Sequence, residues 1–156
     1  LQTLSKIFWE EIMITNPLNA YKETKIKTAS PGQLILMLYA EAIKQASYAL
    51  ELLEQDCRKH PQNIEKINNA IIKTQDIITE LMASLDFEAG GEIAHNLFSL
   101  YVYFNHELME ANIQKNASLL RPVKNMLEEL YKAWVVAVEQ TQGTAGESKV
   151  GVNIAG

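Results

Sequence analysis

The sequence predicts an all-α fold, an antiparallel up-down four-helix bundle with an N-terminal capping segment. Two observations predict it: apolar residues recur at helical spacing in four stretches between residues 31 and 140, and only short segments connect these stretches. No stretch has the alternating pattern of a strand, and 156 residues suit a single domain with one core. We therefore expect an N-terminal segment over 1–30, the bundle over 31–140 and a tail over 141–156.

The first helix is expected over about 31–58 and has to end before Pro61. Ser30 suits the N-cap, Pro31 suits the first helical position, and Gln33 completes a capping box with Ser30. The core face of this helix consists of Leu34, Ile35, Leu38, Ala42, Ala49, Leu52 and Leu53.

The second helix follows a short turn, and a pair of glycines separates it from the third. Gly90-Gly91 permits backbone angles closed to other residues, so one helix can stop after Leu85 and another can begin near Ile93. The apolar stripe of the second helix consists of Ile64, Ile67, Ile71, Ile78, Leu81, Met82 and Leu85.

The third helix is expected over about 93–111 and the fourth over about 118–140. Pro122 is tolerated because it falls near the first turn of the fourth helix. The stripe of the third helix consists of Ile93, Leu97, Leu100, Phe104 and Leu108, and that of the fourth of Leu119, Val123, Met126, Leu127, Leu130 and Trp134.

The two ends of the chain differ in composition. Residues 1–30 carry too many apolar side chains for a segment that only hangs in water, so we expect this segment to dock. Trp9-Glu10-Glu11 fits the translation of a ribosome-binding site just upstream of a start codon at Met13, so residues 1–12 are expected to be a translated leader or an expression remnant. Residues 141–156 hold four glycines and no aromatic residue, which predicts a flexible tail.

Composition narrows the partners and the compartment. The formal net charge is -5, so no basic face is expected and nucleic acid is excluded as a partner. Cys57 is the single cysteine, which rules out an internal disulfide. The longest apolar run, 34–40, is too short to span a bilayer. We expect a cytoplasmic protein that does not insert into membranes.

Glu92-x-x-His95 is the pattern that most suggests a metal, since di-iron four-helix bundles carry Glu-x-x-His on two helices. Only one such pair exists, and His95 lies about half a turn from the apolar stripe of its helix, so it is expected to face water. Cys57-x-x-His60 is half of a zinc site without a second half. The sequence also lacks phosphate-binding loops and nucleophile elbows. We therefore expect no metal, no cofactor and no enzymatic activity, and a carboxylate-bridged metalloenzyme is the remotest alternative.

Apolar side chains outside the core stripes form additional seams. On the first helix the seam repeats every seven residues and lies about 100° around from the core face. The seam residues are Leu36, Ile43 and Leu50 on the first helix, Ile72 and Ile77 on the second, and Phe98, Val102 and Met109 on the third. Two interpretations stay open. The seams either broaden the core or pack on the N-terminal segment, or they form a groove for the amphipathic helices of a partner.

Two motif blocks carry a resemblance to a known family. The first is Thr28-Ala29-Ser30-Pro31 followed by the apolar run 34–39, and the second is Ser84-Leu85-Asp86 followed by Gly90-Gly91-Glu92-Ile93-Ala94 and Asn96-Leu97. Over 16–140 the chain resembles the flagellin-specific export chaperones. The resemblance implies an all-helical bundle that binds the C-terminal region of unassembled flagellin, keeps it from polymerising in the cytoplasm and helps to deliver it to the export apparatus.

The resemblance also implies that the N-terminal segment lies over part of the binding surface and can be displaced. The C-terminal region of flagellin is thus the expected partner, with components of the export apparatus as further partners, and a helical adaptor or structural bundle with another client is the alternative. Gly32-Gln33 and Ala40-Glu41 depart from the pattern of similar proteins, which puts the affinity rather than the class of partner in doubt. The expected partner-binding residues are Leu18, Tyr21, Leu36, Ile43, Leu50, Ile72, Phe98, Tyr101 and Val102.

Overall fold

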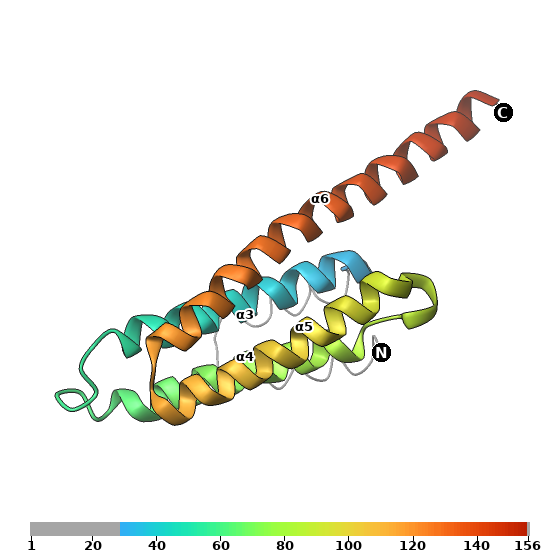
Figure 1. The fold of residues 1–156 in the computed structure, drawn as a ribbon. Coiled ribbons are helices and arrows are strands. Elements are labelled where there is room, and N and C mark those ends of the chain that lie inside the picture. Colours follow the sequence, from blue (N-terminus) through green and yellow to red (C-terminus); the bar gives the residue numbers. More distant parts are fainter. Residues whose placement is uncertain (1–28, 156) are drawn as a thin grey trace.

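The computed structural model describes residues 29–155, with side chains over 29–143 (Figure 1). This part of the chain contains helices and no strand, so the all-α prediction is confirmed. The N-terminal segment lies outside the described residues, apart from its last two. The helices are α3 (Pro31–Leu53), α4 (Asn63–Ala83), α5 (Phe87–Gln114) and α6 (Ala117–Ala155).

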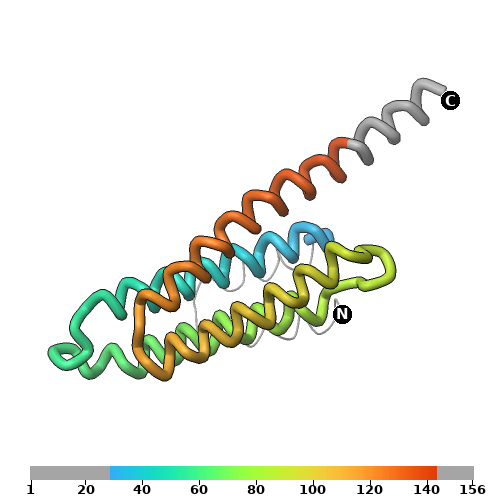
Figure 2. The backbone as a smooth tube through the Cα atoms, in the orientation of Figure 1, coloured from blue at the N-terminus to red at the C-terminus, as the bar shows by residue number. Residues whose placement is uncertain are grey.

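Each of these helices runs antiparallel to the next one along the chain, as Figure 2 shows. α3 packs against α4 and α6, and α5 packs against the same two helices. The four helices therefore form a ring in chain order around one core, and α6 closes the ring on α3. This is the up-down bundle that the sequence predicts.

Aromatic and aliphatic side chains fill the centre of the bundle. Tyr39 from α3 and Tyr101 from α5 are buried, and their hydroxyl oxygens lie 2.5 Å apart in a hydrogen bond. The ring of Trp134 from α6 lies 6.4 Å from that of Tyr39, so the aromatic cluster links three helices. The largest fully buried aliphatic side chains are Leu38, Ile67, Ile71, Ile77, Ile78, Leu81, Leu108, Leu120 and Leu127.

α3 agrees with the prediction at its start and departs from it at its end. The Ser30 hydroxyl accepts a hydrogen bond from the Gln33 backbone N–H, and the Gln33 side chain accepts one from the Ser30 N–H, so the capping box is confirmed. The helix ends at Leu53, and the expected end at residue 58 was wrong. The Asp56 carboxylate accepts a hydrogen bond from the Arg58 backbone N–H, and this local turn competes with a further helical turn.

α5 begins earlier than the sequence predicts. The carboxylate of Asp86 accepts hydrogen bonds from two backbone N–H groups of the first turn, so the helix starts at Phe87 rather than near Ile93. Gly91 then departs from helical geometry with a φ of 51°, which glycine adopts without a side-chain clash. The predicted break at the paired glycines is therefore a kink inside α5.

Three residues assigned to core stripes are exposed instead, namely Ile93, Ile64 and Met126. Ile93 keeps 70% of its surface exposed, and the neighbouring Ala94 is the buried residue. Figure 1 shows α6 turning away from the start of α5, so α6 does not cover that end of the helix. Ile64 is also exposed, because it lies in the first turn of α4 beside the loop that replaces the expected last turn of α3.

α6 continues past its expected end at residue 140. It begins at Ala117, contains Pro122 in its second turn and runs to Ala155. A Cβ atom at Gly32 would lie 3.0 Å from a methyl group of Val138, so α6 crosses the start of α3 at this point. Residues 139–155 span about 25 Å at the helical rise per residue, and α6 extends past the bundle (Figure 1). The flexible tail expected over 141–156 stays a prediction.

Candidate partner-binding surface

The outward side of α5 exposes more large apolar side chains than any other helix in the described part of the chain. Phe98, Val102 and Met109 are spaced by four and seven residues, which places them on one stripe, and each keeps 40 to 47% of its surface exposed. Ile72 on α4 is exposed to a similar degree. The exposed large apolar residues of α5 are Phe87, Ile93, Phe98, Val102, Tyr103, Met109 and Ile113.

A polar ladder joins α4 to α5 beside this stripe. The Asn112 amide donates a hydrogen bond of 2.7 Å to the Asn68 side-chain oxygen, and the Gln75 amide donates one of 3.2 Å to the Asn105 carbonyl. Ile72 lies four residues after Asn68 and three before Gln75, so it lies on the side of α4 that is turned toward α5. We call Ile72, Phe98, Val102 and Met109 together the α4–α5 face.

The ladder contains one unsatisfied acceptor. The Asn105 side chain donates to the Thr79 hydroxyl at 3.4 Å, whereas its own oxygen is buried and accepts no hydrogen bond from the described residues. A buried polar atom without a partner costs free energy, so this position weakens the contact between α4 and α5 locally.

Aromatic rings extend the α4–α5 face to the start of α5. The Phe87 ring packs 4.8 Å from the His95 ring and meets the Phe98 ring edge-on at 5.9 Å. Edge-to-face contacts of this kind stabilise ring pairs beyond the area they bury. His95 is exposed, as its position relative to the apolar stripe predicts.

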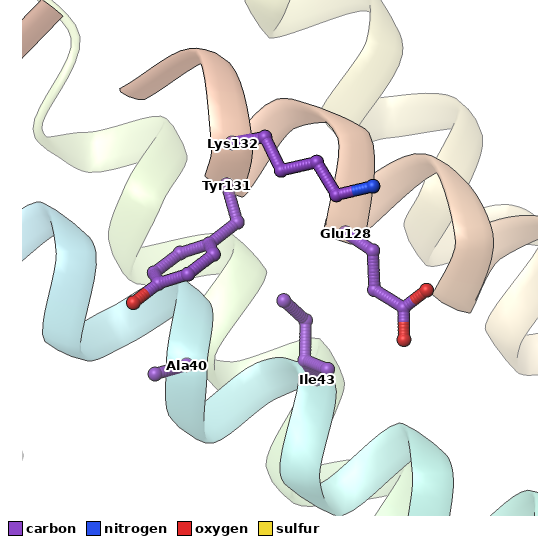
Figure 3. A pocket seen from close by; sticks show the side chains of 5 residues that line it. All are labelled: Ala40, Ile43, Glu128, Tyr131 and Lys132. Atoms are coloured by element: carbon purple, nitrogen blue, oxygen red, sulfur yellow. The ribbon is translucent and has the colours of Figure 1, made fainter. Parts of the chain in front are cut away.

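The α3 seam is largely covered, and one of its residues belongs to the core. Leu50 is only 8% exposed, which favours the interpretation that the seam broadens the core at this position, and its contact with a partner stays a prediction. Leu36 and Ile43 are half-buried. Between α3 and α6, Ile43 borders a pocket of about 400 Å³ (Figure 3). The pocket is lined by Ala40 and Ile43 from α3 and by Glu128, Tyr131 and Lys132 from α6.

Two charged side chains of α6, Glu128 and Lys132, form the polar rim of this pocket, and each takes part in an ion pair along the helix. Glu128 pairs with Lys124 at 3.0 Å, and Lys132 pairs with Glu129 at 3.1 Å. Tyr131 contributes an apolar ring that faces α3 (Figure 3). The pocket therefore combines an apolar floor with a charged rim, which suits one apolar side chain of a partner.

Tyr101 is a core residue and offers no surface to a partner in this state. It is 1% exposed and shares its hydroxyl hydrogen bond with Tyr39. Burial raises the pKa of both tyrosines above the ordinary value, so the pair is neutral. The tyrosine pair links α5 to α3, and the expected contact of Tyr101 with a partner stays a prediction. Ile77 is likewise buried.

Other expectations fall outside the described residues or concern metals and membranes. Leu18 and Tyr21 lie in the part of the chain that the structure does not describe, as do residues 1–12. Among the described residues, no three histidine, cysteine, aspartate or glutamate side chains come together as metal ligands would. No helix of that part has the length and apolar character needed to cross a bilayer.

The family model described as Flagellar protein FliS matches residues 14–141. This range contains α3, α4 and α5 and most of α6. The chain belongs to the FliS family. The resemblance found in the two motif blocks is thereby confirmed.

Relatives across most of the chain agree with this assignment. The flagellar secretion chaperone FliS of Bacillus subtilis (strain 168) is 32% identical over 126 residues, which cover 81% of this chain and 89% of the relative. The flagellar secretion chaperone FliS of Salmonella typhimurium is 36% identical over 113 residues, which cover 72% of this chain and 79% of the relative. Membership of this chaperone family also supports the expectation that the chain is not an enzyme.

Several residues that the fold brings to these surfaces were not predicted from the sequence. Tyr131 follows Leu127 by one helical turn, so its position at the edge of the α6 stripe could have been found. Ile113 follows Met109 by the same spacing and continues the α5 stripe. Phe87 gave no such signal, because only the early start of α5 places its ring against Phe98.

Proposed function

We propose that this chain is a cytoplasmic chaperone that binds the disordered C-terminal region of flagellin, prevents its premature polymerisation and assists its delivery to the flagellar export apparatus. The relatives' name, flagellar secretion chaperone, supports an exported client. The observation that carries the proposal is the α4–α5 face, because a contiguous row of large apolar side chains in water marks an interaction surface.

The face suits an amphipathic segment that folds as it binds. The residues of the face that α5 supplies recur at helical spacing, so a partner helix that lies along α5 would present its own apolar stripe to them. A disordered amphipathic client self-associates through the same stripe. Covering that stripe removes it from self-association, and no nucleotide is required for capture.

The binding free energy expected from this face alone is too small for a stable complex, so the client has to contact more of the chain. Burying the exposed half of one large apolar side chain contributes about 1 kcal/mol, so the residues of the face contribute a few kcal/mol together. A micromolar complex requires about 8 kcal/mol, and ordering the client adds to the cost. We therefore assign further contacts to the pocket at Ile43 and to the half-buried Leu36.

The N-terminal segment is proposed to compete with the client. Leu18 and Tyr21 would lie over part of the binding surface in the free chain and leave it when the client docks. Removing residues 1–22 then raises the client affinity modestly, whereas weaker binding with an unchanged bundle would make the segment part of the site.

Titration with a flagellin C-terminal peptide from the same organism tests the proposal. Calorimetry should give one peptide per chain, and the circular dichroism of the mixture should show more helix than the sum of its parts. A peptide of the same composition in scrambled order is the control, because it lacks the apolar stripe. A mixture spectrum equal to the sum, together with no heat of binding, would contradict the proposal and favour a helical adaptor with another client.

A further inference from the structure

Acidic residues are concentrated on the hairpin that carries the α4–α5 face. The stretch 74–114 covers the second half of α4 and all of α5, and it contains no lysine or arginine. The whole chain has 14 basic and 19 acidic residues, so basic residues outnumber acidic ones outside this stretch. The acidic residues of the stretch are Asp76, Glu80, Asp86, Glu88, Glu92, Glu107 and Glu110.

Several of these carboxylates border the apolar face. Asp76 follows Ile72 by one turn of α4. The residue is exposed, but neighbouring side chains keep part of the water from its carboxylate and so raise its pKa. At the start of α5, Glu92 lies one turn before His95, whose ring packs on Phe87. Asp86 and Glu88 flank Phe87 in the chain and are exposed with Asp76 and Glu92. The face is thus apolar along its middle and bordered by these carboxylates. Two lysines also lie beside it: Lys73 follows Ile72 in the chain, and Lys115 donates hydrogen bonds to Asn112.

The length of the apolar row fits one helix. From Phe98 to Ile113 the row covers about 22 Å at the helical rise per residue, which is about four turns of a docked helix. Val102 and Met109 lie between these ends on the same side of α5.

We propose that the α4–α5 face binds one amphipathic helix of a partner protein whose apolar side contacts Phe98, Val102 and Met109 and whose flanking positions are lysine or arginine. The partner's cations then lie against Asp76 at one edge and against Glu92 at the other. This inference rests on the proposed function, since it assigns the chemistry of the client segment that occupies this face. Complementary charge acts on partner choice and association rate more than on affinity, so it selects among amphipathic helices.

Two designed peptides test the charge preference on the full chain. Both have 18 residues with leucine at the same helical stripe, and their flanking positions are lysine in one peptide and glutamate in the other. Fluorescence anisotropy at low salt should show the lysine peptide binding about tenfold more tightly than its glutamate twin. The difference should shrink as salt is raised to 0.5 M, because salt screens exposed charges.

Two charge-reversed double variants test whether Asp76 and Glu92 cause the preference for the lysine peptide. Asp76→Lys with Glu92→Lys should remove the preference for the lysine peptide. The matched control is Glu51→Lys with Glu139→Lys, which changes the net charge equally at exposed positions of α3 and α6 and should leave the preference intact. Equal loss in both variants would mean that net charge alone acts, and would overturn the proposal.

Parallel titration with the flagellin peptide separates this inference from the proposed function. Flagellin binding with no preference between the designed peptides overturns the inference and leaves the client assignment in place. A clear lysine preference without flagellin binding supports the chemistry of the face and removes flagellin as its client. Binding of neither designed peptide overturns the inference, because the chain itself or a second copy then covers the face.

Discussion

Two apolar seams with similar spacing in the sequence have different positions in the fold. On α3, Leu50 is buried and Ile43 is half-buried, whereas Phe98 and Val102 on α5 are exposed. The difference comes from the neighbouring helices, because α6 packs along the seam side of α3 (Figure 1), whereas the described helices leave the outward side of α5 uncovered. An extra seam therefore indicates surplus apolar surface, and the tertiary arrangement decides whether the chain or a partner covers it.

Leu50→Glu tests the burial of the α3 seam and should lower stability more than any other variant considered for this comparison. The charge would be buried without a partner, so the free energy of unfolding should fall by about 3 kcal/mol or more, and the melting temperature by roughly 10 °C. Thermal melts measure it. Ile72→Glu on the exposed face is the control and should stay within about 0.5 kcal/mol of wild type. A melting temperature near that of wild type would contradict the burial of Leu50 and would indicate that this residue lies at the accessible surface.

Tyr101 lies on α5 near the exposed Phe98 and Val102 but is itself buried, because it pairs with Tyr39 of α3. Tyr101→Phe removes the Tyr101 hydroxyl from the buried Tyr39 hydroxyl, which keeps Trp134 as its neighbour, and should cost about 1 to 2 kcal/mol in urea unfolding. The double variant with Tyr39→Phe removes both hydroxyls and should cost less than the sum of the single variants. Strict additivity would show that the hydrogen bond contributes little.

The same pair predicts a loss of stability at alkaline pH. Burial raises the folded-state pKa of Tyr39 and Tyr101 above about 10, the ordinary value for tyrosine, so the folded state retains protons that the unfolded state releases. Stability is then fully present below pH 10 and falls as the pH rises further. Urea unfolding between pH 9 and pH 11 measures this, and the double phenylalanine variant should show a shallower fall.

Gly91→Ala probes the kink that brings Phe87 to the α4–α5 face. The φ of 51° is unfavourable for alanine, although the added Cβ would meet no atom within 4 Å, so the cost of about 1 kcal/mol comes from the backbone alone. Gly143→Ala, also in open space, is the control and should not destabilise the chain. Equal melts for the two variants would argue against strain at Gly91.

Local chemistry made much of the fold predictable. The capping box at Ser30 and the break at Gly91 depend on a few adjacent residues, and both are present. The early end of α3 was missed because the Asp56 turn opposes a continuing helical pattern. Phe98 and Val102 could be found on α5 from spacing.

The burial of Leu50 and Tyr101 could not be predicted in this way. Their burial depends on helices that are distant in the sequence, such as the contact of Tyr101 with Tyr39 across the bundle. The pocket at Ile43 depends in the same way on α6, which supplies three of its lining residues. Helical spacing defines the faces of one helix and contains no information on which neighbour covers each face.

The most direct test of the α4–α5 face as a client site compares two valines of similar exposure. Val102 on that face is 47% exposed and Val136 on α6 is 53% exposed, so either change to glutamate should leave the melt near that of wild type. In calorimetric titrations with the flagellin C-terminal peptide, Val102→Glu should weaken binding at least about tenfold, because the charge opposes burial under the client. Val136→Glu should bind within about twofold of wild type. Equal affinities for the two variants would contradict the assignment of the client to this face.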